Sequence, residues 1–246
     1  MQQLFNSADV AVVGRFAGDR ALAAVGSCVA LVGIFVNLIV GLSVGPNAAL
    51  ANLIGQKKRE KINVMLHTIL TFGCILGILL LGIGMLSARV VLEVSGTPES
   101  VMSEALLYIR IYFISIPFMI IYNFGSAALR SFGDTRRPMY YLILSGTVNV
   151  ILNLVLVICF KLGVAGVAIA TVISNLLSAS LVIVYLYRRK DEFQFRPEKM
   201  TIDKGRCSSL EFRLVYRARS FLFPMYLYKA GSIYLGKMRS QVLPWR

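Results

Sequence analysis

The sequence predicts an all-α, polytopic helical membrane protein with five full transmembrane helices and, before them, the outer half of a first one. Three observations support this prediction. Of the 246 residues, 57% are hydrophobic and only 15% are charged, whereas a soluble domain is about half apolar and a quarter charged. Apolar stretches of the length that a bilayer requires recur along the chain. The basic residues gather between these stretches and after the last one.

The first element is a short apolar segment. Met1–Gly14 is too short to cross a bilayer as a helix, because a helix rises only about 1.5 Å per residue. We interpret it as the outer half of a helix whose beginning is absent. Five segments follow that supply the roughly 20 mostly apolar residues of a span. They are Ala21–Gln56, Ile62–Ala88, Ala105–Leu129, Pro138–Phe160 and Leu162–Tyr187. A secretory signal has one short apolar core and does not account for five such segments.

Charged residues are almost absent from the five segments. The second contains only His67 and the third only Arg110. We expect His67, the one histidine of the chain, to be packed and hydrogen-bonded. We expect Arg110 to extend its head group to the membrane interface.

Glycines and prolines predict how the helices pack and bend. Gly41–Gly45 and Gly73–Gly77 have the GxxxG spacing at which helices approach closely in lipid. Pro46 and Pro117 fall inside apolar segments, where they kink a helix or leave a carbonyl free. Packing and bending are the ordinary interpretation of these residues, and a hinge or a cavity wall is the alternative.

The connections predict the orientation in the membrane. Every second connection is basic: Lys57, Lys58, Arg59 and Lys61 in one, Arg130, Arg136 and Arg137 in another, and Arg188, Arg189 and Lys190 after the last span. The alternate connections contain only Arg15 and Arg20, then Arg89, then Lys161. By the positive-inside rule we place the basic connections in the cytoplasm.

Composition also excludes several classes of function. The net charge of +14 does not indicate a nucleic-acid partner, because 14 of the 26 basic residues lie from Arg188 onward and most others form short clusters between spans. The four cysteines are far apart and form no CxxC, so neither a disulfide framework nor a metal site of Cys ligands is indicated. We find no phosphate loop, HExxH, GxSxG or carboxylate cluster, so the sequence predicts no enzyme, no catalytic residue and no organic cofactor.

Polar residues within the spans are the candidates for function. Three pairs share a helix face because they lie three or four residues apart: Asn6 with Asp9, Asn149 with Asn153, and Thr171 with Asn175. An ionisable group within a span is costly and is a functional candidate by default. Two alternatives stay open: the amides and the hydroxyl bond across helices for stability alone, or Asp9 lies hydrated at the outer interface near Arg15.

Several stretches occur in the order known from one transporter family. They are LFNSADVAVVGRFAG, then GLSVG before a basic connection, YIRIYFISIPFMIIYNFGSAALRSFGDTRRPM, NVILN and GVAGVAIATVISN. In these stretches the chain resembles the bacterial multidrug and toxic compound extrusion (MATE) transporters. The resemblance covers roughly residues 1–190, which corresponds to most of the N-terminal six-helix lobe of the family.

The resemblance implies a secondary exporter in the bacterial cytoplasmic (inner) membrane. Such a protein exchanges organic cations or drugs for H⁺ or Na⁺ as two lobes rock between inward and outward states. The resemblance gives the coupling role to Asp9 and places Asn6, Asn149 and Thr171 at polar positions of the family. Asn153 departs from the family, which has Asp there.

The residue types are compatible with either coupling ion. Burial in an apolar cavity favours the protonated form of Asp9. Alternatively, Asp9 and the side-chain oxygens of Asn6, Asn149, Asn153 and Thr171 would supply hard ligands for Na⁺. Because Asn153 removes one charge from the site, we favour H⁺ slightly.

Two other functions stay open. One is a flippase for lipid-linked saccharides, which has a related fold but would present basic residues to a central cavity. The other is a non-functional gene remnant, since the start of the first helix and the second lobe are missing from the sequence.

The chain divides into three parts. Residues 1–190 are the predicted transmembrane bundle, 191–204 a cytoplasmic linker, and 205–246 a basic tail with eight basic residues and only Glu211 as an acid. The tail has no uncharged run near the roughly 20 residues of a span, so we expect it not to cross the bilayer. It is either a segment that lies on the membrane surface or, as we prefer, the product of a frameshift.

Overall fold

The computed structural model describes residues 2–57 and 59–188, with side chains described for residues 9–57 and 61–188. Every regular element in these ranges is a helix, as predicted. In chain order they are α1 (Gln2–Phe16), α2 (Asp19–Gly55), α3 (Arg59–Val94), α4 (Glu99–Ile114), α5 (Ile116–Ser131), α6 (Arg136–Leu154), the π-helical turn η1 (Val155–Cys159) and α7 (Gly163–Arg188). The predictions for the linker 191–204 and the tail 205–246 lie outside the described residues.

The described helices confirm a polytopic membrane protein. Four of them are long and apolar enough to cross a membrane, and a fifth span results if α4 and α5 are taken together. The third predicted span is thus broken, with a bend of 40° at Ser115. Pro117 explains the break, because it cannot donate the backbone hydrogen bond to Phe113 that a continuous helix requires. Pro46, by contrast, lies inside α2 without ending it.

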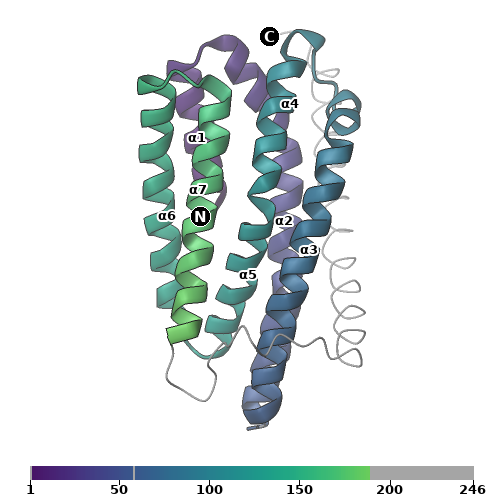
Figure 1. Ribbon diagram of the computed structural model, residues 1–246, viewed down its shortest axis with the longest axis vertical. Coiled ribbons are helices and arrows are strands. Elements are labelled where there is room, and N and C mark those ends of the chain that lie inside the picture. The colour runs from purple at the N-terminus through teal and green to yellow at the C-terminus, as the bar shows by residue number, and fades with distance from the viewer. Residues whose placement is uncertain (1, 58, 189–246) are drawn as a thin grey trace, which may run out of the picture.

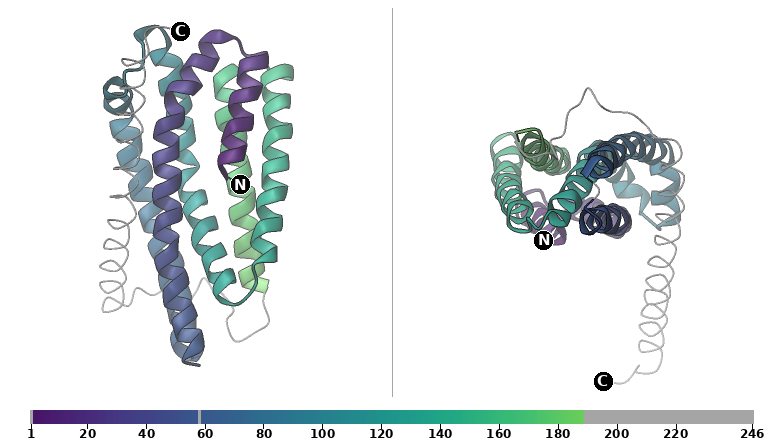
Figure 2. Two further views of the ribbon diagram at one scale, coloured as in Figure 1. Left: turned by 180° about the vertical axis from the view of Figure 1, so that it is seen from behind. Right: turned by 90° about the horizontal axis from the view of Figure 1, so that it is seen from below.

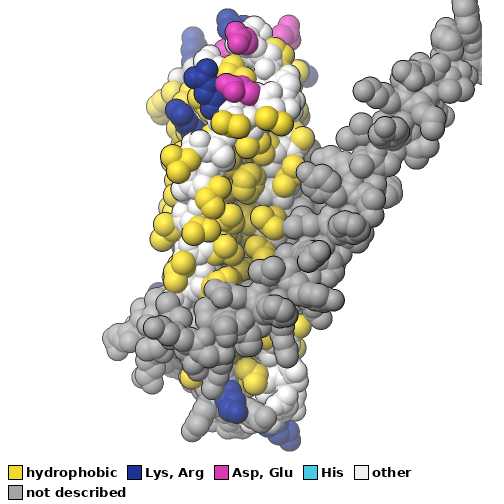
Figure 3. All heavy atoms as spheres, turned by 90° about the vertical axis from the view of Figure 1, so that its right-hand side faces the viewer, with side chains coloured by type: hydrophobic (Ala, Val, Ile, Leu, Met, Phe, Trp, Pro, Cys, Tyr) yellow, Lys and Arg dark blue, Asp and Glu magenta, His cyan; other side chains and the backbone are white. Residues whose placement is uncertain are grey.

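The connections lie alternately at the two ends of the bundle (Figure 1). The α2–α3 and α5–α6 connections and the last residue of α7 lie at one end, which we call the basic end. Its described basic residues are Lys57, Lys61, Arg130, Arg136, Arg137 and Arg188. The α1–α2, α3–α4 and α6–α7 connections lie at the opposite end. On the face of the bundle that Figure 3 shows, the visible coloured side chains between the two ends are hydrophobic, as expected for a surface that faces lipid.

The helix α1 is only half as long as the bundle. It starts midway between the two ends and runs to the opposite end, where the chain turns back into α2 (Figure 2). It packs against α2, α6 and α7.

The sequence FGDTRR forms a tight connection between α5 and α6. Gly133 adopts φ 84°, a left-handed conformation that favours glycine. The backbone N–H of Asp134 donates to the carbonyl of Leu129 and that of Gly133 to Arg130, each at 3.0 Å, which closes the last turn of α5. The Asp134 carboxylate then accepts the backbone N–H of Arg137 and pairs with its guanidinium at 2.9 Å, which starts α6.

One of the two GxxxG predictions is confirmed. A Cβ added at Gly77 would lie 2.7 Å from the Cα of Pro117, and one at Gly73 would lie 2.9 Å from the ring of Phe124. The helix α3 therefore approaches the start of α5 as closely as only glycine allows. At Gly41 an added Cβ meets nothing within 4 Å, so the described residues show no close helix approach at this position.

Candidate functional site

Asp9 is buried inside the bundle. Its exposed fraction is 1%, although the next residues along α1 reach the surface. The alternative of a hydrated position at the interface near Arg15 is therefore wrong. The helix α1 packs against α6 and α7, the two helices that supply the partners of Asp9.

Two side chains donate hydrogen bonds to the Asp9 carboxylate. Asn153 of α6 donates from Nδ2 to Oδ1, and Thr171 of α7 donates from Oγ1 to Oδ2 at 3.2 Å. The Thr171 hydroxyl has a single hydrogen, and the carbonyl of Val167 competes for it at 3.0 Å. The hydrogen bond from Thr171 to Oδ2 is therefore weaker than the hydrogen bond from Asn153 to Oδ1.

Asn149 connects the groups that hold Asp9. Its Oδ1 accepts from Asn153 Nδ2 at 3.2 Å. Its Nδ2 lies 3.4 Å from Thr171 Oγ1 and 3.4 Å from Ser174 Oγ. Asn149 and its three partners are each at most 7% exposed. One hydrogen-bond network therefore joins α1, α6 and α7 in the interior.

The amide oxygen of Asn153 is the incomplete part of this network. It is buried and has no hydrogen-bond partner among the described atoms. A buried acceptor without a partner costs about 1–3 kcal/mol. A hydrogen-bond donor or a cation next to Asn153 would therefore be stabilised there.

The geometry does not form a ligand set for a hard metal cation. A sodium ion would need several oxygen atoms directed at one point. Here the Asp9 oxygens face an N–H and an O–H donor instead, and the Asn149 amide nitrogen faces two hydroxyls. Among the described residues, no group of three or more His, Cys, Asp or Glu that could hold a metal occurs. In this conformation both Asp9 oxygens are therefore occupied by hydrogen-bond donors.

Among the described residues, Asp9 has no basic partner. The ion pairs of the described residues lie near the two ends of the bundle and join Arg20 with Glu104, Arg89 with Glu93, and Arg137 with Asp134. A single buried carboxylate is costly as an anion. Binding a proton removes that charge without any movement of a counter-ion.

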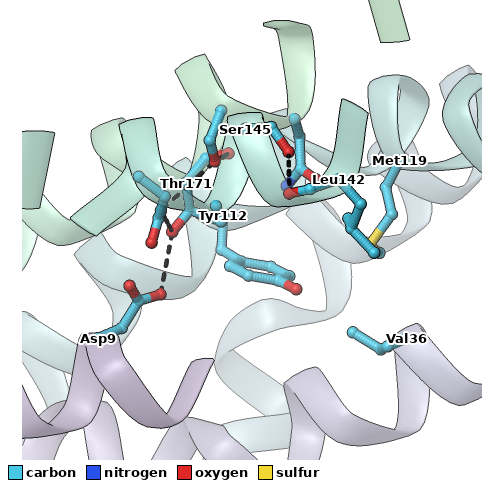
Figure 4. Close-up of a pocket in the computed structure, with 11 residues that line it drawn as sticks. Asp9, Val36, Tyr112, Met119, Leu142, Ser145 and Thr171 are labelled. Carbon is cyan, nitrogen blue, oxygen red and sulfur yellow. Dashed lines mark hydrogen bonds between the residues drawn. The ribbon is translucent and has the colours of Figure 1, made fainter. Parts of the chain in front are cut away.

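A cavity of about 30 Å³ lies beside Asp9. It has room for about two water molecules. In Figure 4, Asp9 and Thr171 lie at one end, Leu142 and Met119 at the other, and the ring of Tyr112 between them. Its walls contain no Lys or Arg. The cavity is too small for an organic substrate in this conformation.

Of the five site residues predicted from the sequence, four meet here: Asp9, Asn149, Asn153 and Thr171. Asn6 lies in α1 one turn before Asp9, but its side chain is outside the described residues. Their functional role stays a prediction. Sequence reasoning missed Tyr112, Ser145 and Ser174, which also line the cavity. Ser145 lies four residues before Asn149, so helical spacing could have identified it, whereas nothing in the sequence marks Tyr112.

Two other polar residues of the spans lie away from this site. His67 is 3% exposed, and its Nδ1 lies 2.7 Å from the carbonyl oxygen of Asn63. It is packed and hydrogen-bonded, as expected. Arg110 is exposed on the surface of α4.

Comparison with known proteins gives consistent matches. The family model MatE matches residues 1–155. The chain is 36% identical over 187 residues to the probable multidrug resistance protein YoeA of Bacillus subtilis (strain 168), which covers 74% of this chain and 40% of that protein. It is 30% identical over 193 residues to YpnP, a probable multidrug resistance protein of the same organism. This match covers 77% of this chain and 43% of YpnP. The chain therefore spans less than half the length of these relatives.

Solved structures show the same fold. A crystal structure of MATE in the bent conformation superposes with a TM-score of 0.83 at 23% identity, covering 90% of this chain and 49% of that one. A crystal structure of MATE in the straight conformation superposes with a TM-score of 0.79 at 25% identity. This match covers 95% of this chain and 53% of that one. The described bundle thus has the architecture of one half of these proteins.

Proposed function

Because this chain belongs to the MatE family of multi-pass membrane transporters, we propose that it forms the ion-coupling lobe of a proton-driven exporter of organic cations or drugs. The observation that supports this proposal best is the buried Asp9 carboxylate. It is held by donors from two other helices and has no basic residue paired with it. A group that changes charge inside the bundle can couple ion binding to helix movement.

The coupling follows from the two charge states of Asp9. As an anion, Asp9 accepts charge-assisted hydrogen bonds from Asn153 and Thr171, which draw α1 towards α6 and α7. Such bonds are roughly twice as strong as bonds between neutral groups. When Asp9 takes up a proton, this attraction falls and α1 is held less tightly. Proton binding would therefore favour a second packing of α1 and change the cavity beside it.

The names of the relatives support an exporter of small molecules. Two are probable multidrug resistance proteins of Bacillus subtilis. A third, 27% identical over 201 residues, is the probable multidrug resistance protein NorM of Thermotoga maritima. We propose the bacterial cytoplasmic membrane as the location, with the basic end in the cytoplasm, and a second lobe as the structural partner. A flippase is not favoured, because a diphosphate would need Lys or Arg at the cavity and its walls have none.

Export of a cationic dye from cells tests the proposal. The chain is joined to the second half of YoeA, because it covers only 40% of that protein. Asp9→Asn should abolish export driven by a proton gradient at equal expression. Glu104→Gln is the matched control, since Glu104 is an acid at the opposite end, and it should export normally. Unchanged export in Asp9→Asn would contradict the proposal.

A further inference from the structure

Six polar side chains face one another between α6 and α7. Asn153, Asn149 and Ser145 follow each other at intervals of four residues on α6. Thr171, Ser174 and Ser178 follow at intervals of three and four residues on α7. All six are at most 7% exposed. We call these six residues the α6–α7 seam.

The seam leads from Asp9 towards the basic end. Helices α6 and α7 run in opposite directions, and each seam residue of α6 has a counterpart of α7 at the same depth. At about 1.5 Å per residue, Asn153 and Thr171 lie about 25 Å from the basic ends of their helices, and Ser145 and Ser178 about 14 Å. The hydrogen bonds of Asn149 to Thr171 and Ser174 confirm this alignment of the two helices.

The cavity follows the same line. The cavity is lined by Asp9 and by four seam residues: Thr171, Asn149, Ser174 and Ser145. It therefore starts at the Asp9 carboxylate and runs along the seam towards the basic end. Figure 4 shows Asp9 with Thr171 at one end and Ser145 displaced towards Leu142. Its volume of about 30 Å³ suffices for about two water molecules in a row.

The serines of the seam do not bond to each other. Ser145 donates to the carbonyl of Leu142, Ser174 to that of Thr171, and Ser178 to that of Asn175, at 2.9–3.0 Å. Each hydroxyl hydrogen is thus used within its own helix, and the oxygen lone pairs can still accept hydrogen bonds. Ser174 also accepts a hydrogen bond across the interface, from Asn149 Nδ2 at 3.4 Å. Among the described residues, Ser145 and Ser178 bond only within their own helices, so their lone pairs still face the interface.

A second observation points to a donor in this region. The amide oxygen of Asn153, at the Asp9 end of the seam, is 0% exposed and has no hydrogen-bond partner among the described atoms. A water molecule would supply the missing hydrogen. The cavity and the lone pairs of Ser145 and Ser174, which line it, favour water along the seam. Asn153 does not line the cavity, but its oxygen adds a buried acceptor at the Asp9 end of the seam.

The seam is closed near the basic end in this conformation. The Tyr122 hydroxyl donates to the carbonyl of Pro138 at 2.8 Å. The guanidinium carbon of Arg137 lies 4.3 Å from the centre of the Tyr185 ring. Val182, at 0% exposed, fills the space next to Gly125 between this closure and the seam.

We infer that the α6–α7 seam is a hydrated route by which the coupling proton moves between Asp9 and the basic end of the bundle. The O–H bond of protonated Asp9 breaks, its electron pair stays on the carboxylate, and a water molecule takes the proton. The proton then passes from water to water along Ser174 and Ser145, which accept hydrogen bonds from the water and do not ionise. Release to the solvent requires that the closure at Tyr122 and Arg137 opens. This inference rests on the proposed function, since it assumes that Asp9 exchanges protons.

Labelling of single cysteines tests the route on the full chain. The four native cysteines are replaced by alanine, and Ser145→Cys and Ser174→Cys are made in turn. Each has a neighbour on the lipid-facing side of the same helix as a matched control: Leu144→Cys, at 49% exposed, and Ile173→Cys, at 40% exposed. The probe is a charged, membrane-impermeant thiosulfonate, added to the cytoplasmic side of inverted vesicles.

We expect both seam cysteines to react at least about ten times faster than their neighbours, because the thiolate forms in water and not in lipid. Equal rates within each pair would overturn the inference, and so would labelling from the opposite side alone. Two positions are used so that one variant that folds poorly does not decide the outcome. The labelling does not require transport, so it is decided separately from the export experiment. Export that does not depend on Asp9 would contradict the proposed function, whereas equal labelling rates would contradict the route.

Discussion

The contact between Gly77 and Pro117 gives a prediction whose size follows from the structure. Gly77→Ala adds one methyl group on the face of α3 that touches the start of α5. The new Cβ would lie 2.7 Å from Pro117 Cα and 3.1 Å from Pro117 Cβ. Carbon atoms that are not bonded prefer a separation of about 3.5–4.0 Å. A backbone atom cannot turn away as a side chain can, so α3 and α5 must separate by about 1 Å.

Such overpacking costs typically about 1–3 kcal/mol. An opposite contribution of about 0.5–1 kcal/mol arises because alanine favours the helix more than glycine does. Gly82→Ala isolates the first effect, because Gly82 lies in the same helix and an added Cβ there meets nothing within 4 Å. For a chain of this size, 1 kcal/mol corresponds to about 2–4 °C in Tm. We therefore expect Gly77→Ala to melt roughly 2–12 °C below Gly82→Ala.

The assay is the Tm of both variants, purified in the same detergent and followed by the loss of the monodisperse peak on size-exclusion chromatography after heating. Gly82→Ala should match or slightly exceed the parent chain. Equal Tm values for the two variants would refute the argument, because they would show that α3 and α5 do not meet at Gly77.

Two further predictions concern packing and orientation. Gly125→Ala should lower the Tm, since its Cβ would clash with a methyl group of Val182. Adding Val182→Ala should make the double variant more stable than the sum of the single changes predicts, and strict additivity would contradict this contact. In intact cells, an impermeant thiol reagent should label Ser95→Cys in the α3–α4 connection and not Gln56→Cys in the α2–α3 connection, in a background without native cysteines. The reverse pattern would contradict the orientation given by the basic residues.

The fold was largely predictable because the bilayer restricts it. Span length and the scarcity of charge within spans predicted the apolar helices, and the short first segment predicted a half-length helix. The break at Ser115 was not predicted as such. Pro117 indicated a disturbance, but whether a proline bends or breaks a helix depends on its neighbours. Pro46 shows this, since α2 continues through it.

The candidate site was predictable in its parts and not in its assembly. Helical spacing placed Asn149 and Asn153 on one face, but it could not say which helix that face meets. The pairing of Asp9 with Asn153 joins residues 144 positions apart and depends on the packing of α1 against α6. The same limit explains Gly41: its spacing permits a close approach, but none of the described atoms lies within 4 Å of a Cβ added there.

The central claim is that Asp9 takes up a proton inside the bundle. It is tested most directly with dicyclohexylcarbodiimide, which reacts with protonated carboxylic acids in apolar surroundings. The purified chain is treated at a series of pH values, and the modified residue is identified by mass spectrometry. The account predicts modification at Asp9 that falls as the pH rises, none at the exposed acid Glu93, and none at this position in Asp9→Asn. If Asp9 stays unmodified at every pH while the chain remains folded, the claim that this carboxylate carries the coupling proton is contradicted.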